Sequence, residues 1–345
     1  MNPTLTDVAQ RAGVSLSTAS RAFSDPDRIG RDTLRRIITA AEEIGYVASA
    51  GRRSRSASLP TRSATVAVIV PDIGNPVFAS FVKAAQAHGW NRRQTIVLTD
   101  TDGSPDRERE ILGELHERVD GFIVCSPRLP AHDIVELCGD APLVLVNRTS
   151  DEANSVVPDA ADGLRQTLEY LRVLGHEHVA YAQGSPLSWS NQSRVEALQR
   201  LADEADIEVE LMGWQAETVA GGQAAAASVI ASGATAVIAH NDLMALGIIS
   251  GAANLGVEVP SDLSVVGIDD TPLAEVGRPT LTSIQVPMSR AGVMSVDMLH
   301  QKLTADPTEP SSAPRAVTLP TQLVVRQSTG PVSGWTPARR GRQDV

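Results

Sequence analysis

From residue 65 onward, short runs of β-branched and other apolar residues alternate with amphipathic segments. The apolar runs cover residues 66–70, 96–98, 122–125, 143–146, 179–182, 236–239 and 265–268. The segments with helical periodicity cover residues 77–88, 107–118, 163–174, 194–205, 222–232 and 243–255. Such alternation predicts α/β lobes, in which parallel sheets are flanked by helices. So many units over residues 65–329 favour two such lobes.

The first 46 residues have a different pattern, which predicts three short helices. Thr4 and Asp7 have the spacing of a capping box that opens the first helix. Gly13 supplies a turn, Ser15 caps a second helix that runs through Phe23, and residues 30–44 form the third. Two helices joined by so short a turn predict an all-α helix-turn-helix unit, although Ala-rich helical hairpins without a DNA role have the same pattern.

The charge of the chain is unevenly distributed. Residues 1–62 contain ten Lys and Arg against six Asp and Glu, whereas the whole chain has a net charge of −11. A basic N-terminal segment on an acidic body suits a part that meets phosphates. A charged, solvated face without a partner explains the charge equally well.

These patterns predict four segments. Residues 1–46 form a helix-turn-helix headpiece, residues 47–64 a basic hinge or linker, residues 65–329 a bilobed core, and residues 330–345 a disordered tail. No leader peptide and no run long enough for a membrane span is evident, so we expect a cytoplasmic protein. Cys125 and Cys138 are expected to be buried thiols. His176 and His178 lack a third ligand, so neither a metal nor a cofactor is expected.

Several motifs occur in a fixed order along the chain. They are LTDVAQRAGVSLSTASR at 5–21, VPDIGNP at 70–76, LGH at 174–176, NDLMALG at 241–247, SVVGIDD at 264–270 and LTSI at 281–284. From Thr4 to about Ser328 the chain thereby resembles the LacI/GalR family of bacterial regulators. The resemblance implies a homodimer, a helix-turn-helix headpiece, a hinge helix that forms on DNA, and a core like that of type I periplasmic sugar-binding proteins.

In the headpiece the resemblance places Leu16, Ser17 and Arg21 on the exposed face of the recognition helix. Arg21 can donate two hydrogen bonds to a guanine, and Leu16 offers apolar contact to a thymine methyl. Four further hydroxyl side chains either contact DNA phosphates or serve only as helix caps. They are Thr4, Thr6, Ser15 and Thr18.

The hinge departs from the family pattern, which usually has Ala-Arg-Ser-Leu with the Leu wedged into the minor groove. The ungapped match here is Arg52, Arg53, Ser54 and Arg55. Either Arg55 enters a narrow minor groove as a cation, or the helix shifts and Leu59 becomes the wedge. A third alternative is a basic tether without a groove contact.

In the core, Arg194 aligns with the position where family members clamp polar ligand groups. Its planar guanidinium suits paired sugar oxygens. Further candidates follow predicted strands, where ligands of parallel sheets bind. They are Asn147, Arg148, Asn241 and Asp269.

The opposite wall of the pocket is expected to contain Asp72, Asn75 and Phe78. Trp189 and Trp214 either stack on a sugar or base, or pack structurally. After the Leu-Thr-Ser-Ile type of motif, where the family often has a Gln, this chain has Val286 one residue past Gln285. This difference weakens the transfer of any particular ligand from the family to this chain.

Three classes of function were compared. A transport-type sugar-binding protein without a DNA role would share the core, but it needs a leader peptide and has no use for the headpiece. An enzyme on such sheets would need a phosphate loop or nucleophile elbow, and the chain contains no GxGxxG, GxxxxGK[ST] or GxSxG. The sequence therefore predicts a non-enzymatic transcription regulator, a repressor, whose affinity for operator DNA changes on binding a small sugar or nucleoside.

Overall fold

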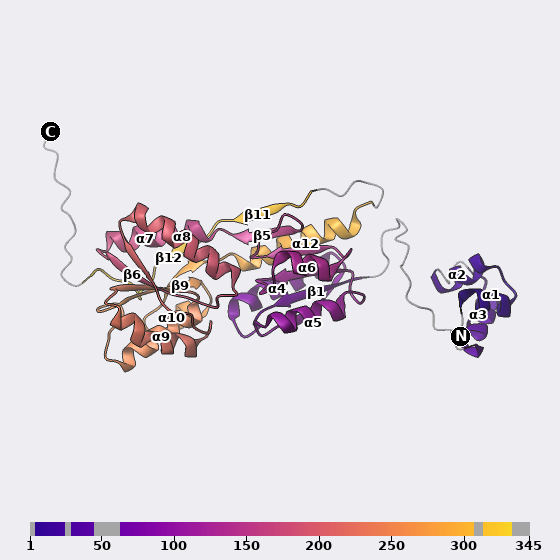
Figure 1. Cartoon of the computed structure of the whole chain (residues 1–345), viewed down its shortest axis with the longest axis horizontal. Helices are drawn as coiled ribbons and strands as arrows, with labels where there is room; N and C mark the ends of the chain where they lie inside the picture. Colours follow the sequence, from indigo (N-terminus) through magenta and orange to yellow (C-terminus); the bar gives the residue numbers. More distant parts are fainter. Residues whose placement is uncertain (1–3, 25–28, 45–62, 307–312, 333–345) are drawn as a thin grey trace, which may run out of the picture. The chain divides into compact units, whose positions relative to one another are not determined.

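The structure is a computed structural model that describes residues 4–24, 29–44, 63–306 and 313–332. The chain divides into two compact units, one within residues 1–58 and the other within residues 59–345 (Figure 1). The predicted hinge residues Arg52, Arg53, Arg55 and Leu59 lie outside the described ranges.

The first unit contains the three predicted helices, α1 (Leu5–Ala12), α2 (Leu16–Ser24) and α3 (Arg31–Glu43). The capping box is confirmed, because the Thr4 side chain accepts from the backbone N–H of Asp7 and the Asp7 carboxylate accepts from the backbone N–H of Thr4. Gly13 ends α1 in the left-handed region at φ 63°. The helices pack around Val8, Ala22 and Ile37, which are buried.

The second unit has two lobes, each with a six-stranded sheet. The N-lobe sheet has the order β11-β5-β4-β3-β1-β2, and all its strand pairs are parallel. Its strands are β1 (Ala64–Val70), β2 (Gln94–Asp100), β3 (Gly121–Cys125), β4 (Leu143–Val146), β5 (Asn154–Pro158) and β11 (Ala316–Leu319). Its helices are α4 (Pro76–Asn91), α5 (Pro105–Leu115), α6 (Ala131–Cys138) and α12 (Met288–Thr304).

The C-lobe sheet has the order β12-β10-β9-β8-β6-β7. Its strands are β6 (His178–Ala182), β7 (Glu208–Leu211), β8 (Ala236–Ala239), β9 (Ser264–Asp269), β10 (Thr282–Gln285) and β12 (Gln322–Val324). Its helices are α7 (Ala160–Val173), α8 (Trp189–Ala205), α9 (Val219–Ala231), α10 (Asp242–Asn254) and the short α11 (Leu273–Val276). The sheet is parallel except that β12 runs antiparallel to β10.

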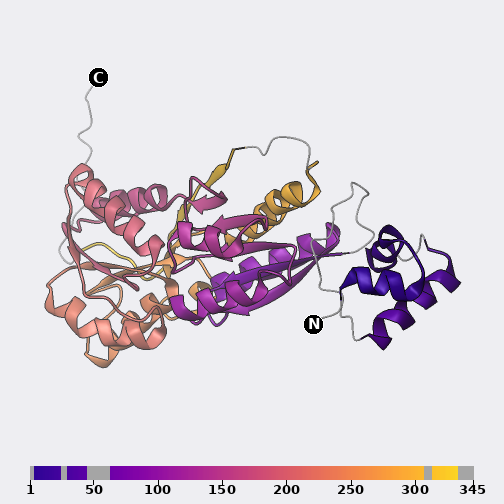
Figure 2. The same ribbon diagram turned by 45° about the vertical axis from the view of Figure 1, so that its right-hand side comes forward.

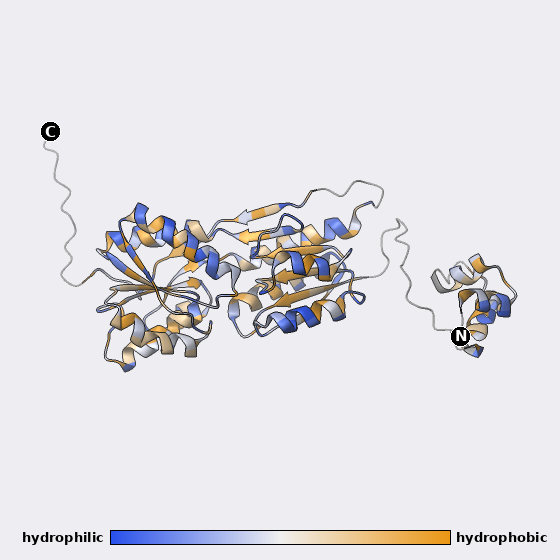
Figure 3. Cartoon of the chain, in the orientation of Figure 1, coloured by the Kyte–Doolittle hydropathy of each residue, from blue (hydrophilic) through white to orange (hydrophobic). Residues whose placement is uncertain are grey.

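Each sheet is covered by helices on both faces, as Figures 1 and 2 show. The central strands are apolar along their whole length because they face helices on both sides (Figure 3). All five residues of β3 and all four of β8 are buried. Cys125 and Cys138 are buried free thiols, as expected.

The chain crosses between the lobes three times. It passes from β5 to α7, from β10 to α12, and from β11 to β12. Hydrogen bonds join the first crossing to the third. Asp159 N–H donates to Leu319 O at 2.8 Å, and Thr321 Oγ1 donates to Asp159 O at 2.6 Å. Each lobe is therefore assembled from segments that are not continuous in sequence.

The predicted boundary of the tail at residue 330 is too early. Gly330 donates from its N–H to Ser264 Oγ and accepts at its carbonyl from Ser264 Oγ, while the backbone N–H of Val332 donates to Leu174 O at 3.0 Å. These main-chain bonds attach residues 330–332 to the C-lobe. The rest of the predicted tail, 333–345, lies outside the described residues. The predicted start of the core at residue 65 is one residue late, because β1 begins at Ala64.

Two of the histidines considered in the sequence have structural contacts. The ring of buried His176 contacts Thr235 Oγ1 and Gly330 O, and His178 is the first residue of β6. Within the described parts of the chain, no group of three or more His, Cys, Asp and Glu side chains is arranged to hold a metal ion. None of the described helices is both long and apolar enough to cross a membrane.

Candidate functional site

A pocket lies between the two lobes, where the carboxyl ends of strands from both sheets meet. Its empty volume, including solvent at its mouth, is about 420 Å³. From the N-lobe it is lined by Asn75, Val77, Phe78, Ser126, Arg128 and Asn147. From the C-lobe and the β10–α12 crossing it is lined by Ser188, Ser190, Arg194, Glu217, His240, Asn241, Asp269, Val286 and Met288.

Three pocket residues at strand ends have positive φ angles although none is glycine. They are Ser126 after β3 at 49°, Asn147 after β4 at 56°, and Asp269 at the end of β9 at 120°. Such backbone costs free energy in an L-residue, most of all at the φ of Asp269, and it is retained where surrounding structure fixes it. Three of the seven non-glycine residues with positive φ in the described part of the chain therefore line the pocket.

Arg194 is held at one side of the pocket by His240. Its Nη1 donates to the main-chain carbonyl of His240 at 2.6 Å and lies 3.3 and 3.4 Å from the two ring nitrogens. Arg194 is buried in the middle of α8, so its guanidinium has a fixed position. Arg194 lines the pocket at this position, and a guanidinium is a donor only, so it can bind acceptor groups of a ligand.

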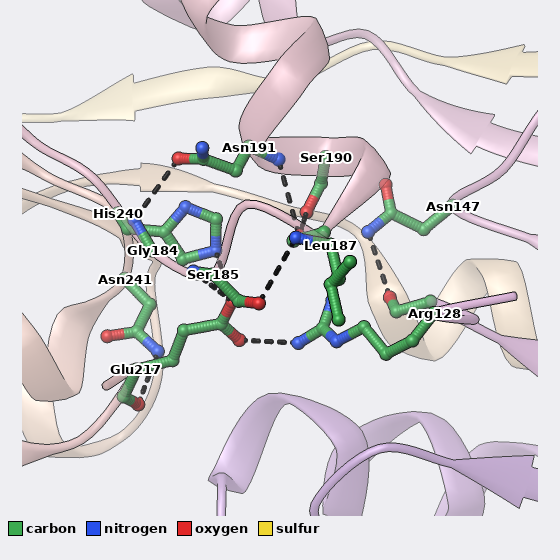
Figure 4. Close-up of polar contacts among 12 residues, drawn as sticks. Arg128, Asn147, Gly184, Ser185, Leu187, Ser190, Asn191, Glu217, His240 and Asn241 are labelled. Atoms are coloured by element: carbon green, nitrogen blue, oxygen red, sulfur yellow. Dashed lines mark hydrogen bonds and ion pairs between the residues drawn. The ribbon is translucent and has the colours of Figure 1, made fainter. Parts of the chain in front are cut away.

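His240 is a neutral residue between groups of opposite charge. Burial and, to a smaller extent, the cations of Arg194 and Arg128 lower the pKa of its imidazole to about 3, although Glu217 acts in the opposite direction. Its Nε2 lies 3.5 Å from Glu217 Oε1 (Figure 4). Its Nδ1 lies 3.2 Å from the hydroxyl of Tyr181. Because the ring is uncharged, its contact with Glu217 is not an ion pair.

Arg128 and Glu217 extend toward each other from different lobes, as Figure 4 shows. Arg128 Nη2 donates to Glu217 Oε2 at 2.8 Å, and the other carboxylate oxygen accepts from the backbone N–H of Ser185 at 3.1 Å. Burial raises the pKa of Glu217, but the Arg128 cation and the hydrogen bond from the Ser185 N–H more than offset it, so the pKa is lowered.

Asp269 is the second carboxyl group of the pocket. Its pKa is raised well above its ordinary value by burial and by the neighbouring carboxylates of Asp242 and Glu217, and the cation of Arg194 only partly offsets this. A protonated Asp269 both donates and accepts hydrogen bonds. The site therefore contains donors and acceptors suited to hydroxyl groups.

An apolar hollow adjoins this polar region and shares Asn147, Ser190, Arg194 and Val286 with it. Trp189, at the first position of α8, lines the hollow together with Leu164, Ile268 and Ile284. Aromatic and apolar walls beside convergent polar groups are usual in sites for sugars and nucleosides.

The structure brings seven of the ten predicted ligand residues together around these two cavities. They are Asn75, Phe78, Asn147, Trp189, Arg194, Asn241 and Asp269. Asn241 also caps α10, since its Oδ1 accepts from Met244 N–H and its Nδ2 donates to Glu217 O.

The other three predicted ligand residues do not line either cavity. Asp72 accepts from the backbone N–H of Gly74 at 2.7 Å in the loop before α4. Arg148 is partly buried beside Glu108. Trp214 is 62% exposed in the segment after β7.

The sequence analysis missed three serines of the pocket, Ser126, Ser188 and Ser190, and three ionisable residues, Arg128, Glu217 and His240. His240 directly precedes Asn241 at the end of β8, and this position beside a predicted residue was an available signal. Arg128 and Glu217 lie in loops after β3 and before α9, and they had no such signal.

In the headpiece, Leu16, Ser17 and Arg21 are exposed on α2, and Leu16 is 50% exposed despite being apolar. The opposite side of α2 buries Ala19 and Ala22. Ser15 Oγ accepts from the backbone N–H of Thr18 and contacts the hydroxyls of Ser17 and Thr18. Thr4 and Thr6 are exposed at the start of α1.

This combination defines a class: a helix-turn-helix unit in the same chain as a two-lobed binding-protein fold. The family model for bacterial regulatory proteins of the lacI family matches residues 4–49, and that for a periplasmic binding protein-like domain matches residues 168–329. The HTH-type transcriptional regulator reg1 of Streptomyces lividans is 31% identical over 99% of this chain and 100% of its own. The chain belongs to the LacI family, and it is a DNA-binding transcription regulator.

Two solved structures are similar over nearly the whole chain. A complex of the transcriptional regulator CelR with cellobiose is 27% identical, with a TM-score of 0.69, and the match covers 95% of this chain and 100% of that one. The lac repressor dimer bound to operator and the anti-inducer ONPF is 25% identical, with the same TM-score, and the match covers 96% and 100%. The predicted fold class and the predicted family are thus confirmed.

Proposed function

We propose that this regulator is a cytoplasmic, non-enzymatic repressor that binds a palindromic operator as a homodimer. A sugar or nucleoside held between the lobes changes its operator affinity. The observation that carries the proposal is the interlobe pocket, where Arg194, Asn147 and Asp269 converge beside an apolar hollow. The similar CelR structure holds cellobiose, which supports a sugar at the corresponding position here.

On the DNA side, we assign the base contacts to Leu16, Ser17 and Arg21, because α2 exposes them while it buries Ala19 and Ala22. Thr4, Thr6, Ser15 and Thr18 contact phosphates near the helix starts. Residues 47–63 serve as the hinge, in which Arg52 and Arg53 contact DNA and Arg55 enters the minor groove. The dimer of the similar lac repressor on its operator supports two-fold binding here.

The test begins with a thermal-shift screen of cellobiose, ribose and adenosine, because a ligand of the native state raises the unfolding temperature as its concentration exceeds Kd. The operator is selected from a random duplex library with the purified protein. We expect a compound that stabilises the wild type in a saturable way and also changes its operator affinity. A compound that stabilises the protein but leaves operator affinity unchanged contradicts the proposal.

A further inference from the structure

The ion pair between Arg128 and Glu217 joins the two lobes at a point away from the three crossings. Arg128 follows β3 of the N-lobe, and Glu217 precedes α9 of the C-lobe. The Arg128 side chain is 6% exposed and that of Glu217 is 20% exposed. Both residues line the pocket.

Both partners of this pair are fixed within their own lobes. The backbone N–H of Arg128 donates to the buried carboxyl group of Glu108 at 2.8 Å. Glu217 accepts from Ser185 N–H with its side chain and from Asn241 Nδ2 with its main-chain carbonyl. A contact between two anchored groups resists separation of the lobes, whereas a pair of free surface side chains would follow the motion.

Separating the lobes would break this contact and open the pocket, so both charges would have to be hydrated instead of paired. The pair is shielded from water while the lobes are together, so its attraction is stronger than that of an exposed pair and opposes the separation. The carboxylate of Glu217 also takes two donors, Arg128 and Ser185 N–H, that a polar ligand would otherwise use.

We propose that Arg128 and Glu217 form a latch that holds the two lobes closed when no effector is bound. The latch itself is a property of the protein without ligand; only its consequence for sensing rests on the proposed function of the pocket. An effector then enters a cleft that is already closed, and it acts on the latch instead of closing an open pair of lobes.

The experiment measures the distance between the lobes in the full-length protein without ligand. Spin labels are attached to cysteines introduced at Glu110 of α5 and Ser228 of α9, which are exposed residues of the two lobes. The native cysteines are buried and do not compete for the label. Labelled subunits are diluted with unlabelled protein, so that pulsed electron double resonance reports distances within one chain.

The variants are Glu217→Gln and Arg128→Met, and the matched control is Asp206→Asn. Asp206 pairs with Arg172 at 2.9 Å within the C-lobe, so its replacement removes one charge and one ion pair without affecting contact between lobes. We expect one short distance in the wild type and the control, and an additional longer distance in both latch variants. Identical distance distributions in all four proteins overturn the proposal.

Thermal unfolding of the two single variants and of the double variant checks the pair independently. We expect the double variant to lose less stability than the sum of the two single variants, because it leaves no buried charge unpaired. Additive losses would mean that the two side chains do not interact in solution. Neither measurement uses a ligand, so a negative ligand screen and a failed latch are distinguishable.

Discussion

Arg194 and His240 are joined by main chain and side chain together: one guanidinium nitrogen donates to the His240 carbonyl at 2.6 Å and lies within 3.4 Å of its imidazole. The carbonyl is at the end of β8, so the sheet itself sets the position of the guanidinium. A charged group held in this way loses little freedom when a ligand binds, which favours affinity.

Replacing Arg194 with Ala is expected to abolish the effector-dependent change in operator affinity while ligand-free binding to nonspecific DNA stays intact. Arg200→Ala is the matched control, because Arg200 lies on the same helix and pairs with Glu204 at the surface. Fluorescence anisotropy of labelled DNA, with and without the compound found in the screen, measures both quantities. A full ligand response in Arg194→Ala would place the effector elsewhere.

Arg21 is expected to read a guanine in each half-site of a palindromic operator. Arg21→Ala should cost about 1 to 3 kcal/mol per half-site and relax the preference at that one base, since no other exposed residue of α2 can bond O6 and N7 of guanine together. Selection from a random duplex library measures the preference at every position. An unchanged preference, or an asymmetric site, contradicts this assignment.

Arg11→Ala is the control for the loss of a cation from the headpiece. Arg11 is exposed on α1 and pairs with Glu43 of α3 at 2.8 Å. Its replacement should leave the base preference of the selected sites unchanged.

For the hinge, Arg55→Ala is expected to weaken operator binding and to reduce its salt dependence, whereas Leu59→Ala should have little effect. The reason is that a cation in the minor groove releases counterions on binding, and an apolar wedge does not. Operator affinity at several salt concentrations distinguishes the two residues. The reverse order of effects would assign the wedge to Leu59.

His240 is expected to make the stability of the protein depend on pH. Its pKa is about 3 in the folded protein, against an ordinary value of 6.5, so between these values the unfolded chain binds more protons. The contribution of neutral His240 to the free energy of unfolding is therefore fully present above pH 6.5. It decreases by about 1.4 kcal/mol per pH unit as the pH falls from 6.5 toward 3. Urea unfolding at pH 7, 6 and 5 measures the slope.

His240→Gln should remove this contribution to the pH dependence, because a neutral amide takes up no proton in this range. His132→Gln is the control, because His132 is exposed and a hydrogen bond with Glu152 raises its pKa. The control should keep the loss of stability at low pH. If His240→Gln keeps the same loss, another group is responsible for it.

The sequence predicted most of the central elements, because buried parallel strands are continuous apolar runs. β8 begins and ends at the predicted residues, and the predicted β3 and β4 differ from the observed strands by one residue at most. The strands that were missed are at sheet edges or are partly polar. β7 has alternating exposure along Glu208–Leu211, and β12 contains only three residues.

Three helices were also missed, α6 (Ala131–Cys138), α11 (Leu273–Val276) and α12 (Met288–Thr304). None has a side-chain cap at its start, and all three follow a proline that occupies the N-cap position. A search based on capping residues and long apolar stripes does not detect such starts. For α12 the omission matters, because it packs on α4 and begins at the pocket.

The candidate site was predictable where it follows a strand. Asn147, Asn241 and Asp269 each lie at the end of an apolar run, so the topology of parallel sheets places them at one edge. Arg128 and Glu217 are 89 residues apart and meet only because the lobes approach each other. Trp214 shows the opposite error, since an aromatic residue near a strand end was expected at the pocket but is exposed.

The three crossings also have a consequence for biosynthesis. The N-lobe sheet needs β11 at its edge, and α12 covers one of its faces, yet both follow nearly the entire C-lobe in the order of synthesis. The headpiece can fold as soon as it leaves the ribosome, because its contacts are local. The N-lobe must wait, with one face of its sheet covered by α4 but not yet by α12, until about residue 319 has emerged. Truncation anywhere between the start of α12 and the end of β11 therefore leaves a complete headpiece attached to an incomplete first lobe, and this interval is where chaperone demand during translation should be greatest.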